Sequence, residues 1–151
     1  MTKPKKSMRA IEILLVEDSP SDVRLTREAL KQAKVLNTLH VMKDGAEAMD
    51  FLHRKGKHKG SPRPDIILLD LNLPKKDGRE VLAEIKADPD LKRVPVVILT
   101  TSKAEEDIVR SYELHANAYI TKPVDLARFL EGIKSLEQFW LAVVTLPPNV
   151  K

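Results

Sequence analysis

Short apolar runs alternate along the chain with segments in which apolar residues recur at helical spacing. Three runs, at 11–16, 66–69 and 94–99, are almost entirely apolar, and weaker ones lie at 39–41 and 118–121. Continuous runs of this length are typical of strands that are buried on both faces of a parallel sheet. The pattern therefore predicts five strands.

Helices are predicted between these runs and after the last of them. They cover about 23–33, 46–54, 81–87, 102–114 and 126–140. Asp44 and Asp125 are predicted N-caps, since a short polar side chain can accept hydrogen bonds from the first helical turn. Ser102 and Glu105 have the spacing of a capping box. Two glycines and two prolines mark residues 55–64 as a loop.

Strands that alternate with helices predict an α/β fold. The expected architecture is a doubly wound, five-stranded parallel sheet with helices on both faces. In sheets of this kind, ligands bind outside the carboxyl ends of the strands. Functional side chains are therefore expected where the strands end.

Length and composition narrow the class of protein. A chain of 151 residues that is 42% hydrophobic and 32% charged suits one soluble globular domain. No apolar run approaches the roughly 20 residues of a membrane span, and the start of the chain does not resemble a secretory signal. The absence of cysteine excludes a thiolate nucleophile, disulfides and cysteine-based zinc sites, and it fits a cytoplasmic location.

The net charge of +4 is confined to the beginning of the chain. Residues 1–9 hold four basic and no acidic residues, and the rest of the chain carries equal numbers of each sign. A second basic cluster lies at 54–63. The chain has only six aromatic residues, whereas nucleic-acid binding usually combines a broad basic face with aromatic stacking. The charge pattern therefore argues against a nucleic-acid partner.

Polar side chains follow four of the five predicted strands. Glu17 and Asp18 follow the first strand, Asp70 the third, Thr100 the fourth and Lys122 the fifth. Each alone is a common turn or surface residue. Together, the crowded carboxylates would repel one another, and a hard divalent cation would relieve that repulsion. The set predicts Mg²⁺-dependent transfer of a phosphoryl group to Asp70, with Lys122 and Thr100 holding its oxygens.

Five motifs occur in order on the predicted elements: Val16-Glu17-Asp18, Leu68 to Pro74, Asp77-Gly78, Ile98 to Thr101, and Lys122-Pro123. With them, the chain resembles the receiver domain of two-component response regulators over about residues 9–140. The resemblance implies a flavodoxin-like receiver fold with strand order 2-1-3-4-5. It also implies a signalling protein that promotes its own phosphorylation and dephosphorylation rather than an enzyme.

The resemblance assigns an acceptor and a metal pocket. Asp70 is the expected phosphoacceptor. Glu17, Asp18 and Asp70 are the expected metal ligands, together with the backbone carbonyl of Asn72. Mg²⁺ is the expected ion, with Mn²⁺ as a substitute.

The resemblance also assigns a switch. Thr100 is the switch hydroxyl, and Tyr119 is the aromatic residue that turns inward when Thr100 moves. Lys122 is expected to pair with the phosphoryl group. The peptide bond between Lys122 and Pro123 is expected to be cis.

Two further features are similar to the small response regulators of cyanobacterial phytochromes. One is the long basic loop at 55–64, and the other is the apolar continuation of the last helix. The similarity implies that a sensor histidine kinase of the phytochrome type donates the phosphoryl group. The output would then be contact with a further, unidentified protein.

The predicted organisation has three parts, which are a basic arm at 1–8, a receiver domain at 9–141 and an extension at 142–151. No DNA-binding output domain is expected, because too few residues follow the receiver. The large apolar residues near the end would form a patch that monomers seldom expose. They predict a homodimer, with Phe139, Trp140 and Val143 as candidate contacts.

Two other functions stay open at this point. Haloacid-dehalogenase-type phosphatases also use a strand-end aspartate, a lysine, a hydroxyl and Mg²⁺. They place a second aspartate two residues after the nucleophile, where this chain has Asn72, which cannot act as a general acid. The other alternative is a phosphate-independent scaffold or nucleic-acid-binding protein, for which binding would weaken steeply with salt.

Overall fold

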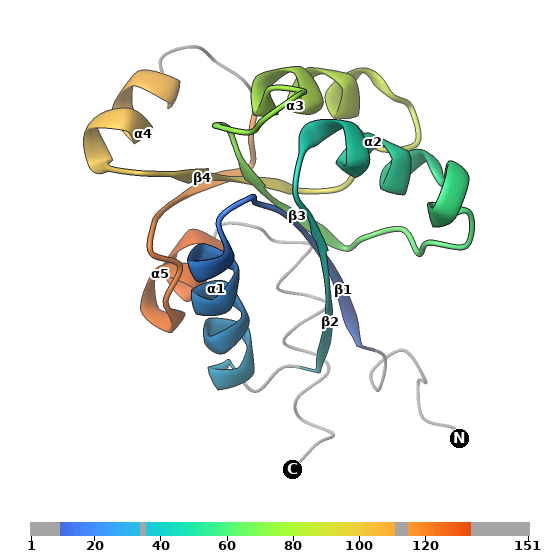
Figure 1. Cartoon of the computed structure of the whole chain (residues 1–151). Helices are drawn as coiled ribbons and strands as arrows, with labels where there is room; N and C mark the ends of the chain where they lie inside the picture. Colours follow the sequence, from blue (N-terminus) through green and yellow to red (C-terminus); the bar gives the residue numbers. More distant parts are fainter. Residues whose placement is uncertain (1–9, 34–35, 111–114, 134–151) are drawn as a thin grey trace, which may run out of the picture.

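The computed structural model describes residues 10–33, 36–110 and 115–133. They form a five-stranded sheet in which all strands are parallel and the order is β2-β1-β3-β4-β5 (Figure 1). The strands are β1 (Ile11–Val16), β2 (Asn37–Met42), β3 (Ile66–Asp70), β4 (Val96–Thr100) and β5 (Ala118–Thr121). The predicted fold class and the strand order implied by the family resemblance are both confirmed.

Helices cover both faces of the sheet (Figure 1). On one face lie α1 (Pro20–Gln32) and α5 (Leu126–Ile133), and on the other lie α2 (Gly45–His53), α3 (Gly78–Ala87) and α4 (Lys103–Arg110). Leu30 and Phe129 belong to one cluster of buried residues, while Phe51, Leu82 and Val109 belong to the other. The sheet therefore separates two apolar cores, as expected for a doubly wound fold.

The burial of the strands explains their sequence pattern. Every residue of β3 and β4 is buried. β2 lies at the edge of the sheet and is less buried, so it contains polar residues. For this reason the apolar pattern predicted only residues 39–41 of this strand. β4 begins two residues later than predicted, at Val96. Pro95 has no N–H to donate to the ladder, although its carbonyl accepts a hydrogen bond from Ile67 at 2.9 Å.

Short polar side chains fix the starts of the helices. Asp44 and Asp125 each accept a hydrogen bond of 2.8 Å from the backbone N–H three residues on, as predicted. α1 starts at Pro20, three residues earlier than predicted, because Ser19 caps its first turn. This earlier start places Asp22 in the first turn of α1.

The loop after α2 is held in place by backbone and side-chain contacts. It contains a single 3-10 turn, η2 (Gly56–His58). The Arg54 guanidinium donates to the Ser61 carbonyl at 2.8 Å, and Arg63 donates to the Asp90 carbonyl at 2.8 Å. The basic residues of this loop are therefore presented by an ordered segment.

Gly78 allows α3 to start directly behind the end of β3. A Cβ atom at this position would lie 2.5 Å from Leu71 Cα and 2.6 Å from the carbonyl oxygen of Asp70. Only glycine fits this approach without displacing the backbone. The close packing fixes the loop that carries Asp70 against the first turn of α3.

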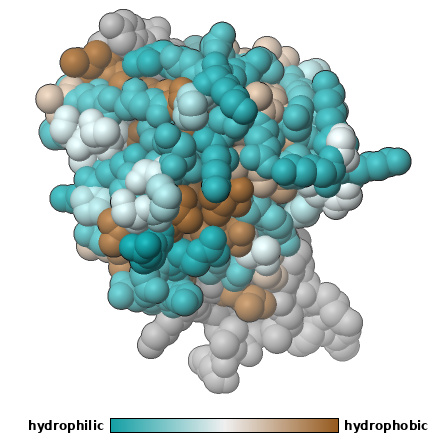
Figure 2. All heavy atoms as spheres, in the orientation of Figure 1, coloured by the Kyte–Doolittle hydropathy of each residue, from teal (hydrophilic) through white to brown (hydrophobic). Residues whose placement is uncertain are grey.

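The face of the molecule shown in Figure 2 is mainly hydrophilic, with a group of apolar side chains near its middle. The large apolar residues that are exposed in the described part of the chain are Leu25, Leu36, Ile108 and Leu130. Among the described residues, no helix has the length and apolar character needed to cross a bilayer.

Candidate functional site

The carboxyl ends of the strands bring the predicted polar residues to one edge of the sheet. Asp70 is the last residue of β3 and Thr100 the last of β4, and these strands are neighbours. The backbone N–H of Lys122, just after β5, donates to the Thr100 carbonyl at 2.7 Å. The strand order of the sheet thus brings residues that are far apart in the sequence together in one cluster.

The Lys122 ammonium lies at the centre of this cluster. Its Nζ donates to Asp70 Oδ2 at 2.8 Å and lies 2.8 Å from Glu17 Oε1, in an ion pair whose angles are not those of a hydrogen bond. Burial alone would lower the pKa of Lys122, but the contacts with Asp70 and Glu17 outweigh it and raise the pKa. The ammonium therefore remains charged beside Asp70.

Glu17 is an acid that is almost completely buried. Burial, together with the negative charge of Asp70, raises its pKa to about 7, against the opposing effect of Lys122. Its Oε2 accepts a hydrogen bond from the Ser19 backbone at 3.1 Å. A buried carboxylate in this position is costly to ionise unless a cation faces it.

Three carboxylates form a group with the composition of a metal site. One oxygen each from Glu17, Asp18 and Asp70 can be chosen so that all three lie within 4.8 Å of one another. Asp18 is exposed and the other two are buried, so the group opens toward solvent on one side. A set of hard oxygen donors with an open side suits a divalent cation that retains water.

Thr100 is fully buried, and its hydroxyl has no hydrogen-bond partner among the described residues. Buried polar groups are nearly always paired, so an orphaned hydroxyl needs an explanation. A group added at Asp70, on the neighbouring strand, would supply an acceptor. The buried Thr100 hydroxyl is thus placed to donate a hydrogen bond once such a group is present.

Comparison with known proteins identifies the family. The family profile of the response regulator receiver domain matches residues 13–134. The chain belongs to this receiver family. The receiver is 57% identical over 135 residues to the response regulator Rcp1 of Synechocystis sp., with 89% of this chain and 92% of that protein covered.

Solved structures resemble the receiver over most of its length. The phosphorylated cyanobacterial phytochrome response regulator RcpA is 53% identical, with a TM-score of 0.72 and coverage of 88% of this chain and 95% of its own. The Mn²⁺-bound form of Rcp1 is 56% identical, with a TM-score of 0.70 and coverage of 87% and 94%. The bacteriophytochrome response regulator AtBRR is 45% identical, with a TM-score of 0.81 and coverage of 87% and 96%. The receiver is thus related to phytochrome response regulators, in a family whose general role is phosphoryl-acceptor signalling.

Asn72 joins the site to α4. Its backbone N–H donates to Asp70 Oδ1 at 2.9 Å, and its side-chain amide donates to Glu105 at 3.2 Å. Glu105 also accepts from the N–H and the hydroxyl of Thr101, at 2.6 and 3.1 Å. Burial would raise the pKa of Glu105, but these hydrogen bonds and the charge of Arg79 lower it.

Sequence reasoning missed two carboxylates of the site. The spacing of Ser102 and Glu105 in the sequence predicts a capping box. The Ser102 side chain does cap α4, accepting from the Glu105 backbone at 3.1 Å, but the Glu105 carboxylate binds Thr101 instead of the Ser102 backbone. The rule that ligands bind at strand ends does not point to Asp22, yet the Asp22 Oδ2 accepts a hydrogen bond from Lys122 Nζ at 3.1 Å. Its place four residues after Asp18, in a first helical turn, was the available signal.

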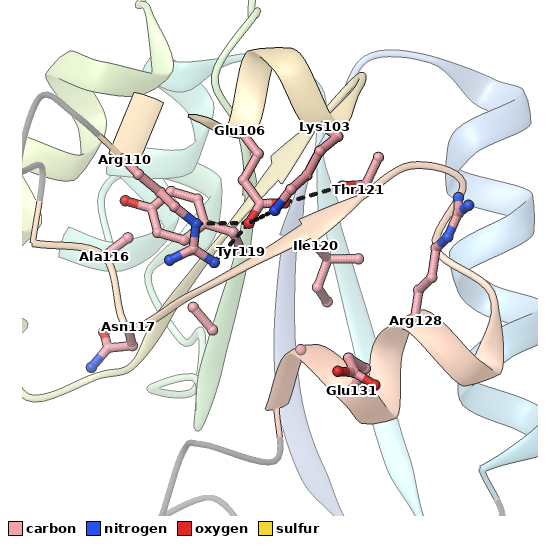
Figure 3. Close-up of a pocket in the computed structure, with 12 residues that line it drawn as sticks. Lys103, Glu106, Arg110, Ala116, Asn117, Tyr119, Ile120, Thr121, Arg128 and Glu131 are labelled. Carbon is pink, nitrogen blue, oxygen red and sulfur yellow. Dashed lines mark hydrogen bonds and ion pairs between the residues drawn. The ribbon is translucent and has the colours of Figure 1, made fainter. Parts of the chain in front are cut away.

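Tyr119 lies on β5 beside a pocket of about 480 Å³ that α4, β5 and α5 enclose (Figure 3). Its ring is half-buried, and the Arg110 guanidinium stacks over it at 4.2 Å from the ring centroid. Burial raises the pKa of the Tyr119 hydroxyl. The Lys122–Pro123 peptide bond at the end of the same strand is cis.

The predicted dimer contacts Phe139, Trp140 and Val143 lie outside the described residues. The same holds for the basic arm at 1–8 and for the extension at 142–151. These features stay predictions.

Proposed function

We propose that this receiver accepts a phosphoryl group on Asp70 from a sensor histidine kinase and signals by contacts with another protein. The observation that carries the proposal is the Lys122 ammonium, 2.8 Å from the carboxylates of both Asp70 and Glu17. A positive charge fixed beside a strand-end carboxylate can stabilise negative charge that arrives on it.

In the proposed transfer, one bond to phosphorus forms and another breaks. An oxygen of Asp70 forms a bond to phosphorus while the bond from phosphorus to the kinase histidine breaks, and the electron pair returns to the imidazole nitrogen. Lys122 then pairs with the phosphoryl oxygens. The Thr100 hydroxyl, which has no hydrogen-bond partner within the described residues, donates to one of them.

Glu17, Asp18 and Asp70 would hold the divalent cation, for which we propose Mg²⁺ with Mn²⁺ as a substitute. The Asn72 backbone carbonyl is a further proposed ligand. When bound, the cation neutralises charge on the phosphoryl oxygens. The open side of the carboxylate group leaves room for such an ion, and the Mn²⁺-bound form of the related Rcp1 supports the assignment.

The proposed output is a conformational change that begins at Thr100 and is passed on to Tyr119. When Thr100 turns toward the phosphoryl group, it vacates space beside β5, and Tyr119 turns inward. That movement would break the stack with Arg110 and reshape the pocket between α4, β5 and α5 (Figure 3). We propose this face as the contact for the downstream protein.

A phytochrome-type sensor kinase is the proposed donor. The identity with Rcp1 and RcpA supports this choice, since RcpA is a cyanobacterial phytochrome response regulator. We place the exchange in the cytoplasm, in agreement with the cysteine-free sequence.

The first experiment is intact-mass spectrometry after incubation with acetyl phosphate, with and without Mg²⁺. We expect a labile adduct of one phosphoryl group that requires Mg²⁺ and disappears in Asp70→Asn. The matched control is Asp107→Asn, which changes an exposed aspartate of α4 and should keep the adduct. Steady hydrolysis of a phosphate ester would support the phosphatase alternative. No adduct from acetyl phosphate or from a kinase would favour the phosphate-independent scaffold.

A further inference from the structure

Asp22 is a fourth carboxylate near the site, and it does not lie at the end of a strand. It lies in the first turn of α1, and its Oδ2 accepts a hydrogen bond from Lys122 Nζ at 3.1 Å. The two residues are 100 positions apart in the sequence. The contact therefore belongs to the assembled site and not to the local start of the helix.

Three carboxylates surround the Lys122 ammonium, two of them through hydrogen bonds and Glu17 through an ion pair. Lys122 Nζ lies 2.8 Å from Asp70, 2.8 Å from Glu17 and 3.1 Å from Asp22. Phosphoryl oxygens that approach Nζ must therefore compete with these three carboxylates for its positive charge and for its three N–H donors.

Burial decides which carboxylate can leave. The side chain of Glu17 is 1% exposed and that of Asp70 is 5% exposed, whereas that of Asp22 is 29% exposed. A buried carboxylate that moved away from the ammonium would stay uncompensated in a poorly solvated site. Asp22 can instead turn toward water.

We propose that Asp22 is a positioning residue that holds Lys122 in the resting receiver and must be displaced by the incoming phosphoryl group, so that it slows phosphoryl loading. This inference rests on the proposed function of Asp70. The negative charge of Asp22 adds to the barrier, because it repels an anionic phosphodonor at the solvent side of the site.

The test measures the rate of loading in Asp22→Asn and in wild type, with saturating Mg²⁺ and intact-mass detection. With acetyl phosphate, an Asp70 oxygen bonds to phosphorus as the bond to the acetate oxygen breaks, and acetate leaves with the electron pair. We expect the apparent second-order rate constant to rise several-fold in Asp22→Asn. The gain should shrink as salt is added. It should also be smaller with phosphoramidate, which carries less negative charge.

Two variants serve as controls. Asp22→Glu keeps the charge and should load at a rate near wild type. Glu28→Gln removes the same charge from an exposed position of α1, about 9 Å farther along the helix axis, and should leave the rate unchanged. Circular dichroism verifies the fold of each variant, and Asp22→Ser replaces Asp22→Asn if the latter does not fold.

The outcomes separate two failures. A folded Asp22→Asn that loads at the wild-type rate would show that Lys122 pairs with the phosphoryl group without displacing Asp22, and the inference would be wrong. A slower rate would show that Asp22 assists loading, which also overturns it. If wild type forms no adduct with either donor and none with a sensor kinase, the proposed function fails and the inference fails with it.

Discussion

Lys122 is the residue on which the charge balance of the site depends. It faces Glu17 and Asp70, both of which are buried, and its own raised pKa keeps it protonated. A buried acid without a cation is among the most destabilising features that a single substitution can create. The contribution of Lys122 to stability can therefore be measured apart from its contribution to phosphoryl transfer.

We predict that Lys122→Met loses about 3–5 kcal/mol of unfolding free energy in metal-free buffer, because two buried carboxylates lose their counterion. Glu17→Gln in the same background should recover part of the loss, since a neutral amide needs no cation. Urea denaturation measures both. Lys75→Met removes an exposed ammonium 3.7 Å from Asp44; this variant is the control and should cost less than about 1 kcal/mol. Equal losses in the two lysine variants would contradict the prediction.

Thr101 is exposed just after the end of β4. It follows Thr100 directly, and its N–H and hydroxyl are held by Glu105. We predict that its bulk restricts the approach of water, so that Thr101→Ala shortens the lifetime of the phosphorylated state several-fold. The decay of the mass adduct after removal of the donor measures this. Thr101→Val keeps the bulk and should keep the lifetime; a shortened lifetime in Val but not in Ala would refute the steric explanation.

Between elements, Glu106 ties α4 to β5. It accepts hydrogen bonds from Arg110 Nε at 2.7 Å and from the Thr121 hydroxyl at 3.2 Å. Burial would raise the pKa of Glu106, but the hydrogen bond and charge of Arg110 and the charge of Lys103 lower it. Because the folded-state pKa is depressed, this contribution to stability is present above the ordinary value of 4.5 and is lost as the pH falls through the lowered pKa.

We predict that Glu106→Gln loses about 1.5–3 kcal/mol near neutral pH, as expected for hydrogen bonds to a charged group. The difference from wild type should narrow as the pH falls below 4.5, where wild type gains a proton. Denaturation curves at several pH values measure the trend. Asp107→Asn on the same helix is exposed and should show little effect. A gap that widened toward acid pH would contradict the assignment.

At the scale of the whole molecule, the sequence predicts a homodimer. Its candidate contact residues lie outside the described part of the chain. Their apolar character predicts self-association, and light scattering of the full chain at increasing concentration should show a dimer. Trp140→Ser should shift the distribution toward the monomer. Leu36→Ser, at an exposed apolar position of the described surface, should not. Monomer at every concentration would exclude the dimer.

The strands β3 and β4 could be predicted from the sequence because burial on both faces requires apolar residues at every position before the last. The rule that ligands bind at strand ends then located Asp70 and Thr100. Asp22 was not predicted because its partner Lys122 lies 100 positions away and meets it only once α1 and β5 are assembled. The role of Glu105 was not predicted because two local contacts compete for its carboxylate, and it binds Thr101, four residues earlier, instead of the Ser102 backbone.

The long-range contacts of Lys122 also constrain the order of assembly during synthesis. The ammonium arrives with one of the last segments of the domain to leave the ribosome, yet it pairs with Asp22, 100 residues earlier, and with Asp70, 52 residues earlier. Contacts of such high separation form late, after the loops between them have closed. An unfinished chain that ends before β5 would hold the carboxylates without their counterion. We predict that such a chain is not phosphorylated by acetyl phosphate, so that a nascent receiver would become competent for the proposed transfer only after β5 has formed.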